Sequence, residues 1–569
     1  MSALREERHR ARELLPVVRP RPREQARLHE LCDAAAAGHA LLLRVRREGP
    51  RGRDAAAAGG AGALTTAPTL CAPAGVGAAF VVASTCPRCA APLDFAEGSN
   101  AVRCAHCGTV LLVTGRRRVL RWAVRPRVSA VEARKLAAFA SGAAAARGAP
   151  RLVFVPYYRL TAEELFWQRE RVRRAPRAAD PEQPLDEGGR LLRALGGGSR
   201  AEGEVELQLA SRAIERSFLA CPEIAGLATW SLGVRTGVLR LELFDRETLE
   251  RDGVVVEPTV AADAALARAL APQVPGDTVH RDVLRVVLSL VWFPLWTVPT
   301  AARRVAVIDA VTGSMVARDA GAAELDALLA GDGAAAGGTH VVGFRPLCCP
   351  NCGWDFAVRA ADVVFHCGSC ERTWELRGEE LEQIASDVVA PTAADASDAL
   401  PRLPVWEVRG AVTTRQAPAA ASVVLPQRLF APAFSWRPLD HLCDLGVRLA
   451  RRAPAAPDLE PTKEMPLVGC SLDREDALVL ARVVALALLL DDGNVRFAAA
   501  RGRPVPGVAI DDPVTRLVWL PFAGDAYSVR DPFGRYALPR RAVESMIGEP
   551  LPGVASKTRS PSSPLRARP

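Results

Sequence analysis

The sequence reads CPRCAAPLDFAEGSNAVRCAHC from residue 86 to 107 and CPNCGWDFAVRAADVVFHCGSC from residue 349 to 370. In both segments two C-x-x-C pairs are separated by fourteen residues. A C-x-x-C pair places two sulfur atoms in one tight turn, and two such turns complete a tetrahedron of thiolates around one Zn²⁺. The fourteen intervening residues suffice for two short strands and a turn. The spacing therefore predicts two zinc ribbons.

Four thiolates fill the coordination of a zinc ion and leave no position for water, so both ions are expected to be structural. Each ribbon is too small to fold without metal, and metal binding should be coupled to folding. Phe95 and Phe356 are expected to pack over the two sites. The predicted ligands are Cys86, Cys89, Cys104, Cys107, Cys349, Cys352, Cys367 and Cys370.

Other interpretations of these cysteines explain less of the pattern. A redox-active C-x-x-C of the thioredoxin type needs one pair, not two. An iron–sulfur centre uses the same ligands, but the symmetric spacing favours zinc. His106 and His366 lie beside ligands and could replace one, although four cysteines already complete each site. Cys348 precedes the first ligand of the second ribbon and is expected to be an additional thiol.

The two segments resemble the zinc ribbons of transcription factor IIB, of RNA polymerase subunits and of the replication-restart helicase. Together with VPYY at 155–158, FPLW at 293–296 and LPVW at 403–406, they look like a group of uncharacterised bacterial zinc-ribbon proteins. The resemblance covers little beyond the ribbons. It implies that the ribbons contact either protein or nucleic acid, because both uses occur among zinc ribbons.

The motifs of common enzymes are missing from the sequence. A helicase needs a phosphate-binding loop that ends in Gly-Lys-Ser/Thr, and none of the three lysines, Lys135, Lys463 and Lys557, follows a glycine. There is no G-x-S-x-G elbow and no H-E-x-x-H motif. Asp309 and Asp525 are the best candidates for catalytic carboxylates, but turn roles explain them more simply.

Composition places the 569-residue chain among globular proteins, since 49% of its residues are hydrophobic and 24% are charged. The net charge is +9, and nearly all basic residues are arginine, as in proteins from GC-rich genomes, so this basicity is weak evidence for a nucleic-acid partner. Paired cysteines and a charged N-terminus favour a reduced, cytoplasmic location. The most apolar segments, 283–298 and 477–490, are too short or too interrupted for a membrane span.

A strand motif, L-V-[FW]-[VFL]-P-[YLF], recurs at 152–157, 290–295 and 517–522, with weaker copies at 403–406 and 429–434. The motif predicts buried strands that end or kink at the proline, or that lie at a sheet edge, because proline cannot donate a ladder hydrogen bond. Its recurrence indicates an internally duplicated architecture in which each ribbon precedes small α+β units.

Other local signals predict individual elements. Ser129 and Glu132 form a capping box at the start of a helix to residue 141. The segment 471–490, with an acidic first turn, is the clearest helix in the chain. A hairpin is expected over 304–316, and 169–203 reads as a charged, glycine-rich linker.

These observations predict a multidomain α+β protein with two four-cysteine zinc ribbons and repeated small α+β units. Residues 1–80 are expected to be disordered or weakly structured, or in part not translated, and the tail is also expected to be disordered. The expected divisions are 1–80, ribbon 1 at 81–114, an α+β region at 115–330, ribbon 2 at 345–376, a second α+β region at 401–550, and a tail at 551–569.

The most consistent function is that of a zinc-binding, non-enzymatic scaffold with a protein partner. The alternative is a nucleic-acid-binding protein of transcription or replication, which would use the basic run from Arg116–Arg118 to Arg127 with Trp122, and the aromatic side chains of the proline strands for stacking. An enzyme is a third possibility, and a pocket joining Asp309, Tyr157 and Trp296 would favour it.

Overall fold

The computed structural model describes residues 81–115, 119–141, 148–172, 204–221, 240–271, 277–300, 304–321, 342–389, 401–415, 425–452, 468–524, 527–531 and 537–547. All of them belong to one compact unit that spans residues 71–569. The segments 1–80 and 551–569, the basic run Arg116–Arg118 and the carboxylate of Asp525 lie outside the described residues, so the predictions made for them stay predictions.

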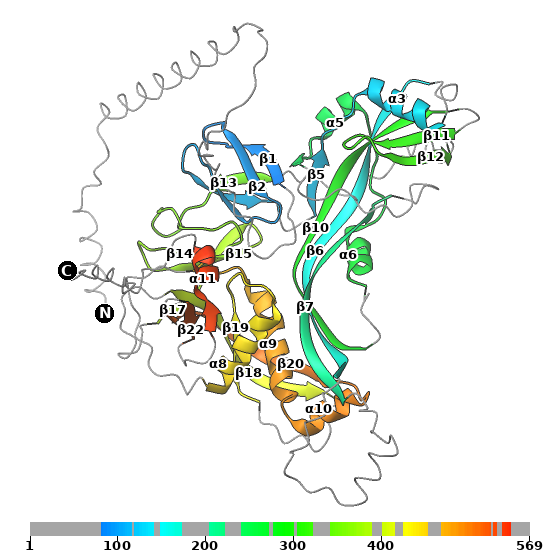
Figure 1. Cartoon of the computed structure of the whole chain (residues 1–569). Helices are drawn as coiled ribbons and strands as arrows, with labels where there is room; N and C mark the ends of the chain where they lie inside the picture. Colours follow the sequence, from blue (N-terminus) through cyan, green and yellow to red (C-terminus); the bar gives the residue numbers. More distant parts are fainter. Residues whose placement is uncertain are drawn as a thin grey trace, which may run out of the picture. The chain divides into compact units, whose positions relative to one another are not determined.

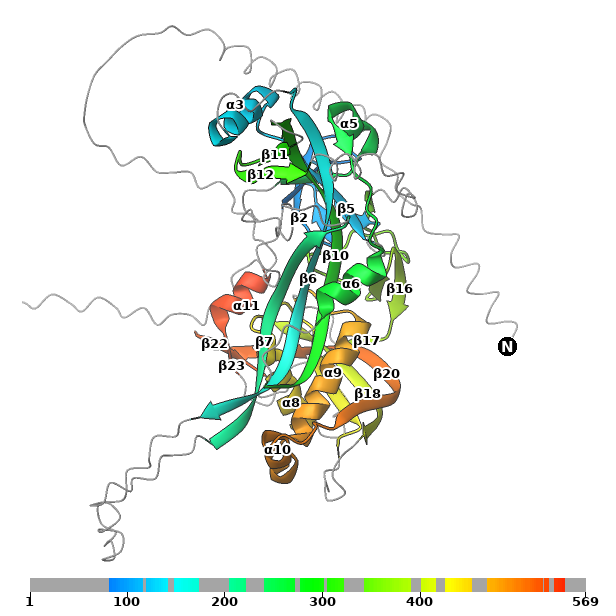
Figure 2. The same ribbon diagram turned by 90° about the vertical axis from the view of Figure 1, so that its right-hand side faces the viewer.

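The first half of the chain is built on a sheet of ten described strands (Figure 1). Strands β6, β7 and β10 are long and run side by side (Figure 2). Three helices contact strands of this sheet: α3 (Ala130–Ser141), α5 (Arg246–Asp252) and α6 (Ala262–Leu270). Its strands are β1 (Val81–Thr85), β2 (Pro92–Ala96), β5 (Leu120–Val124), β6 (Arg151–Val172), β7 (Glu204–Leu219), β8 (Arg240–Leu243), β9 (Val254–Val255), β10 (Thr278–Pro299), β11 (Arg304–Asp309) and β12 (Met315–Gly321).

The second half is built on a sheet of four described strands, in the order β17-β20-β18-β19. Helices α8 and α9 pack on this sheet, and their apolar side chains share its core. A small three-stranded sheet, β21-β22-β23, follows with helix α11. The elements are β17 (Ser386–Val388), β18 (Arg402–Arg415), β19 (Arg428–Pro432), α8 (Asp440–Arg452), α9 (Arg474–Leu489), α10 (Gly493–Ala500), β20 (Gly507–Pro521), β21 (Ala523–Gly524), β22 (Ser528–Arg530), β23 (Ala537–Pro539) and α11 (Arg540–Ile547).

Two small three-stranded sheets belong to the cysteine segments. The first has the order β13-β4-β3 and the second β14-β15-β16. Mixed sheets and helices of these sizes make the protein α+β, as the sequence predicted. The strands are β3 (Ala101–Arg103), β4 (Val110–Thr114), β13 (Gly343–Pro346), β14 (Val364–His366), β15 (Thr373–Arg377) and β16 (Glu380–Ile384).

The proline motif pairs with itself in the same register in both halves. β6 runs antiparallel to β10, and β18 runs antiparallel to β20. In each pair, a motif proline lies opposite the residue two positions before the proline of the partner strand. The opposed residues are Pro156 and Trp292, Phe154 and Pro294, Pro404 and Trp519, and Arg402 and Pro521.

The expectation that the prolines end their strands is confirmed at Pro521, the last residue of β20. It is wrong at Pro156, Pro294 and Pro404, which lie inside paired strands. β6 continues through Pro156 to Val172, paired with β10 on one side. On its other side, β6 pairs with β9 up to Phe154, and its pairing with β7 begins at Tyr157. The Pro156 carbonyl points to that side, since it accepts a hydrogen bond from the Ala220 amide at 2.9 Å. The missing N–H therefore falls at the gap between two neighbours, where no ladder bond is lost.

The same contacts recur around the second pair of motif strands. The Ala433 amide donates to the Pro404 carbonyl at 2.9 Å, as Ala220 does to Pro156. The Trp292 indole donates to a carbonyl at Val256, at 3.0 Å, and the Trp519 indole donates to one at Val468, at 3.3 Å.

The helices that follow are placed alike as well. The Tyr158 hydroxyl donates to the carbonyl of Val260 and the Trp406 indole to that of Leu472, both at 2.8 Å. Helix α6 begins two residues after the first acceptor, and α9 begins two residues after the second. The paired motif strands and the helix placed against them are thus arranged alike in the two halves.

Other local expectations meet mixed outcomes. The capping box is present: the Ser129 amide donates to Glu132 Oε2 at 2.9 Å, and the Glu132 amide donates to Ser129 Oγ at 3.3 Å. The expected linker at 169–203 is wrong at its start, because β6 extends to residue 172. β8 pairs with β1, so ribbon 1 and the region after it share a sheet. The expected division into ranges stays a prediction.

Candidate metal centres

Each C-x-x-C pair folds into the same turn. In all four, the amide of the residue after the second cysteine donates to the carbonyl of the first, at 2.8–2.9 Å. This geometry requires a positive φ at the donor residue, which two glycines adopt without strain and two other residues adopt under tertiary constraint. The donors are Ala90 (φ 56°), Gly108 (φ 71°), Gly353 (φ 75°) and Glu371 (φ 58°).

The four sulfur atoms of ribbon 1 converge on one point. Cys86 Sγ lies 3.8 Å from Cys107 Sγ, and Cys89 Sγ lies 3.7 Å from Cys104 Sγ. All four lie within 4.8 Å of one another. A tetrahedron with metal–sulfur bonds of ~2.3 Å has edges of about 3.8 Å, whereas a disulfide needs about 2.05 Å. The donors fit one tetrahedral metal ion.

Ribbon 2 repeats this arrangement. Cys349 Sγ lies 3.5 Å from Cys370 Sγ, and Cys352 Sγ lies 3.5 Å from Cys367 Sγ. All four sulfur atoms again lie within 4.8 Å of one another. All eight predicted ligands are therefore brought together in two groups of four, each able to hold one metal ion.

The thiols of ribbon 1 differ in acidity. Cys107 Sγ lies 3.2 Å from Thr109 Oγ1, and hydrogen bonds with Thr109 lower the pKa of Cys107 to about 6. Burial and hydrogen bonds to the neighbouring cysteines raise the pKa of Cys89 to about 12. Phe95 shares a buried cluster with Cys86 and Cys104, as predicted. Phe356 is buried in the same way with two ligands of ribbon 2.

The neighbouring histidines and the extra thiol take no part in either group. His106 is exposed. His366 Nδ1 lies 2.9 Å from the Thr373 hydroxyl, and its ring meets the edge of Trp519. Cys348 is not among the sulfurs of the second group.

The two ribbons pack against each other, which the sequence did not predict. β13 leads into ribbon 2 and pairs with β4 of ribbon 1. The Asn100 amide donates to the carbonyl of Ala360 at 2.6 Å. Val110 and Leu112 of β4 face the core of ribbon 2, whereas Leu111 and Val113 face the core shared by ribbon 1 and the large sheet. β4 is therefore a common wall of both metal centres.

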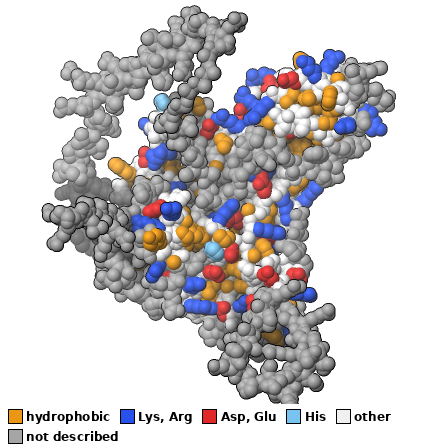
Figure 3. Space-filling view, in the orientation of Figure 1, with side chains coloured by type: hydrophobic (Ala, Val, Ile, Leu, Met, Phe, Trp, Pro, Cys, Tyr) orange, Lys and Arg blue, Asp and Glu red, His pale blue; other side chains and the backbone are white. Residues whose placement is uncertain are grey.

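The aromatic side chains proposed for stacking on nucleic acid are core residues. Trp122 is 1% exposed, and its indole donates to Glu97 Oε1 at 3.0 Å. Tyr157 and Tyr158 are each 3% exposed, and Phe522 is fully buried. On the face drawn in Figure 3, basic and acidic side chains are interspersed. The stacking interpretation of these residues is wrong, because motif strands at the centre of a sheet bury their side chains on both faces.

Asp309 has the turn role that the sequence favoured over a catalytic one. Asp309 is buried and Oδ1 accepts hydrogen bonds from the amides of Val311 and Thr312, at 2.7 and 3.0 Å, which is a turn role. The structure instead has a cavity of about 520 Å³ that Asp309, Tyr157 and Trp296 do not line. Its walls come from residues distant in the sequence, which no local motif could have indicated.

Among the described residues, no helix is long and apolar enough to cross a membrane. Comparison of the chain with protein-family models, with curated proteins and with solved structures found no match in any of the three.

Proposed function

We propose that the protein is a zinc-binding, non-enzymatic scaffold that docks a protein partner on its ribbon pair. The observation that carries this proposal is the closed geometry of the two four-cysteine groups. Four sulfur donors are typical of structural zinc and leave no open position for a substrate or a reactive water. The metal then serves to fix the backbone conformation of a binding surface.

The surface that supports protein binding lies at the first turn of ribbon 2. Trp354 is 66% exposed, although its carbonyl accepts a hydrogen bond from the Cys349 amide at 2.8 Å. Pro350 and Asn351 beside it are exposed as well. Exposed tryptophan side chains on a rigid backbone are enriched among the residues that dominate protein interfaces. Loading of the adjacent site with zinc would fix the backbone that presents Trp354.

Metal analysis tests the first part of the proposal. Protein purified without added chelator is expected to carry two zinc ions per chain. Iron in place of zinc, with the visible absorption of a cluster, would contradict the choice of metal, and negligible bound metal would contradict the whole assignment.

Affinity capture tests the second part. Trp354→Ala is expected to lose a captured protein that the unaltered chain retains, with metal content unchanged. Phe139→Ala is the matched control, because Phe139 is 92% exposed on α3, outside the ribbons. Direct binding of nucleic acid that weakens steeply with salt would support the alternative function instead. Equal capture by the two variants would argue against docking at Trp354.

A further inference from the structure

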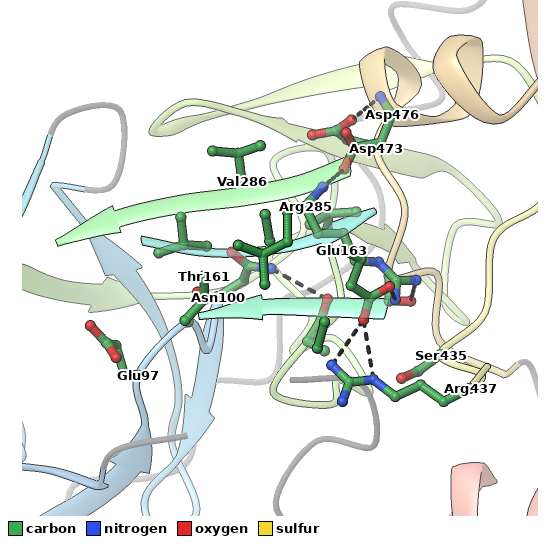
Figure 4. A pocket seen from close by; sticks show the side chains of 18 of the residues that line it. Glu97, Asn100, Thr161, Glu163, Arg285, Val286, Ser435, Arg437, Asp473 and Asp476 are labelled. Atoms are coloured by element: carbon green, nitrogen blue, oxygen red, sulfur yellow. Dashed lines mark hydrogen bonds and ion pairs between the residues drawn. The ribbon is translucent and has the colours of Figure 1, made fainter. Parts of the chain in front are cut away.

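The cavity of about 520 Å³ lies where both ribbons meet both halves of the molecule (Figure 4). The loop Glu97–Asn100 of ribbon 1 and residues 361 and 363 of ribbon 2 form one side. Strands β6, β7 and β10 and the start of α9 form the others. Its volume lies within the range of small-molecule sites, which is about 300–1,000 Å³.

One carboxylate in the cavity is already neutralised. Glu163, whose side chain is 7% exposed, pairs with Arg285 at 3.1 Å and with Arg437 at 3.0 Å. Figure 4 shows Glu163 between these two arginines. Both guanidinium groups that line the cavity are thus committed to the same anion.

Two further carboxylates lie next to each other at the start of α9. Asp476 Oδ2 accepts a hydrogen bond from the backbone amide of Arg285 at 2.9 Å, and Asp473 Oδ1 accepts one from the Asp476 amide at 2.8 Å. Burial raises the pKa of Asp476 to about 7, and the nearby Asp473 adds to this rise. Among the described residues, neither Asp473 nor Asp476 forms an ion pair with an arginine or lysine side chain, although the charge of Arg285 acts to lower the pKa of Asp476.

The rest of the lining decides what kind of cation fits. Ile214, Val286, Val287 and Val363 provide an apolar wall. Outside the cysteine groups, the described part of the chain has no set of three His, Cys, Asp or Glu ligand atoms within 4.8 Å of one another. A small divalent ion held by protein side chains alone would need such a set, whereas an organic cation needs one charged contact and apolar walls.

We propose that this cavity binds a small organic cation, an amine, amidine or guanidinium with an apolar body, whose charged end contacts Asp473 and Asp476. The apolar body lies against the valine and isoleucine side chains. This inference concerns a site that is separate from the docking surface at Trp354, and it holds or fails independently of zinc-dependent partner binding.

Three probes of nearly the same shape test the sign of the charge. Benzamidine is cationic, benzamide is neutral and benzoate is anionic. Calorimetry on the full, metal-loaded chain is expected to show binding of benzamidine, binding of benzamide about tenfold weaker, and no binding of benzoate, since a charge-assisted hydrogen bond contributes about this factor. Tighter binding of benzoate, or no binding of benzamidine at millimolar concentration, would overturn the proposal.

Variants test which carboxylates of the cavity contact the charged end of the probe. Asp476→Asn is expected to weaken benzamidine binding about tenfold and to leave benzamide binding unchanged. Asp473→Asn should have the same effect on benzamidine binding. Because asparagine also serves as a helix N-cap, this variant can replace Asp476→Asn if the latter folds poorly. Asp263→Asn is the control, because Asp263 lies in the first turn of α6, the helix equivalent to α9, outside the cavity. Unchanged benzamidine affinity in both folded cavity variants would overturn the assignment.

Discussion

At the scale of single residues, a close approach joins the second half to ribbon 2. A Cβ added to Gly469 would lie 1.9 Å from Oδ1 of Asp362. Asp362 is 4% exposed, and its other oxygen accepts a hydrogen bond from the Arg359 amide at 2.8 Å. Only a glycine leaves room for the Asp362 carboxylate at this position. The carboxylate is therefore buried away from water.

Gly469→Ala is therefore expected to destabilise the protein by about 2 kcal/mol or more, because overpacking of a rigid site forces the backbone or the carboxylate to move. Denaturant unfolding measures the change. Gly493→Ala is the matched control, since a Cβ there meets nothing within 4 Å and lies at the start of α10. Equal stability of the two variants would contradict the close contact.

Asp362 should also make stability depend on pH. Burial raises its pKa to about 7, against about 3.9 in an unfolded chain. The folded state then binds the proton more tightly, so the stabilisation is complete below about pH 4 and is lost as the pH rises through 7. Asp362→Asn is expected to recover up to about 4 kcal/mol at pH 8 and only about 1.5 kcal/mol at pH 5. A pH profile identical to that of the unaltered chain would refute this role.

At the scale of elements, β4 couples the two metal centres. Its four apolar residues from Val110 to Val113 are at most 3% exposed and alternate between two cores. The sequence alone predicts that a ribbon which loses its metal ion unfolds, while the other ribbon keeps its ion. The structure argues otherwise, because disorder in β4 would remove a wall of ribbon 2 and its pairing with β13.

Cys89→Ser is therefore expected to lose one metal ion and also to speed the release of the second ion to a chelator, several-fold or more. Metal content and chelator kinetics measure both effects. Cys348→Ser is the control, because Cys348 belongs to neither group, and it should keep both ions. Release of the remaining ion at the unaltered rate would mean that the ribbons act independently.

At the scale of the whole molecule, the two halves share one strand-pair arrangement. Ribbon 1 packs on the first half, ribbon 2 packs on the second half, and the two ribbons pack on each other. The hydrogen bonds at Pro156 and Pro404 have the same length, and the two central tryptophans donate to equivalent carbonyls. Because the ribbons pack on these two halves, metal binding should also stabilise the parts of the molecule that lie outside the ribbons.

Chelation of the metal is expected to lower the Tm of the entire described unit by several degrees or more in a single transition, since loss of metal-linked folding free energy is shared through β4. Calorimetry with and without chelator measures this. An unchanged main transition, beside a separate small one, would show that the ribbons are energetically detached.

The sequence by itself determined the features that depend on short spacings. The groups of four cysteines follow from C-x-x-C turns, and the recurrence of the paired strands from a strand motif. The existence of α9 follows from its acidic first turn, although the helix begins at Arg474, with Asp473 as N-cap, and not at Ser471. Each is local chemistry, which a few neighbouring residues specify. The tolerance of Pro156 within a paired strand was not visible, because it depends on where β9 ends and β7 begins.

Only the tertiary structure decided what meets across the chain. Glu97 and Arg159 form a buried ion pair with each other, and Glu163 pairs with Arg437, more than two hundred residues away. The packing of one ribbon on the other, the burial of Trp122 and the cavity all arise from such long-range contacts. Periodicity shows that a side chain will be buried but carries no record of its partner, so the neighbours of both metal centres could be assigned only in three dimensions.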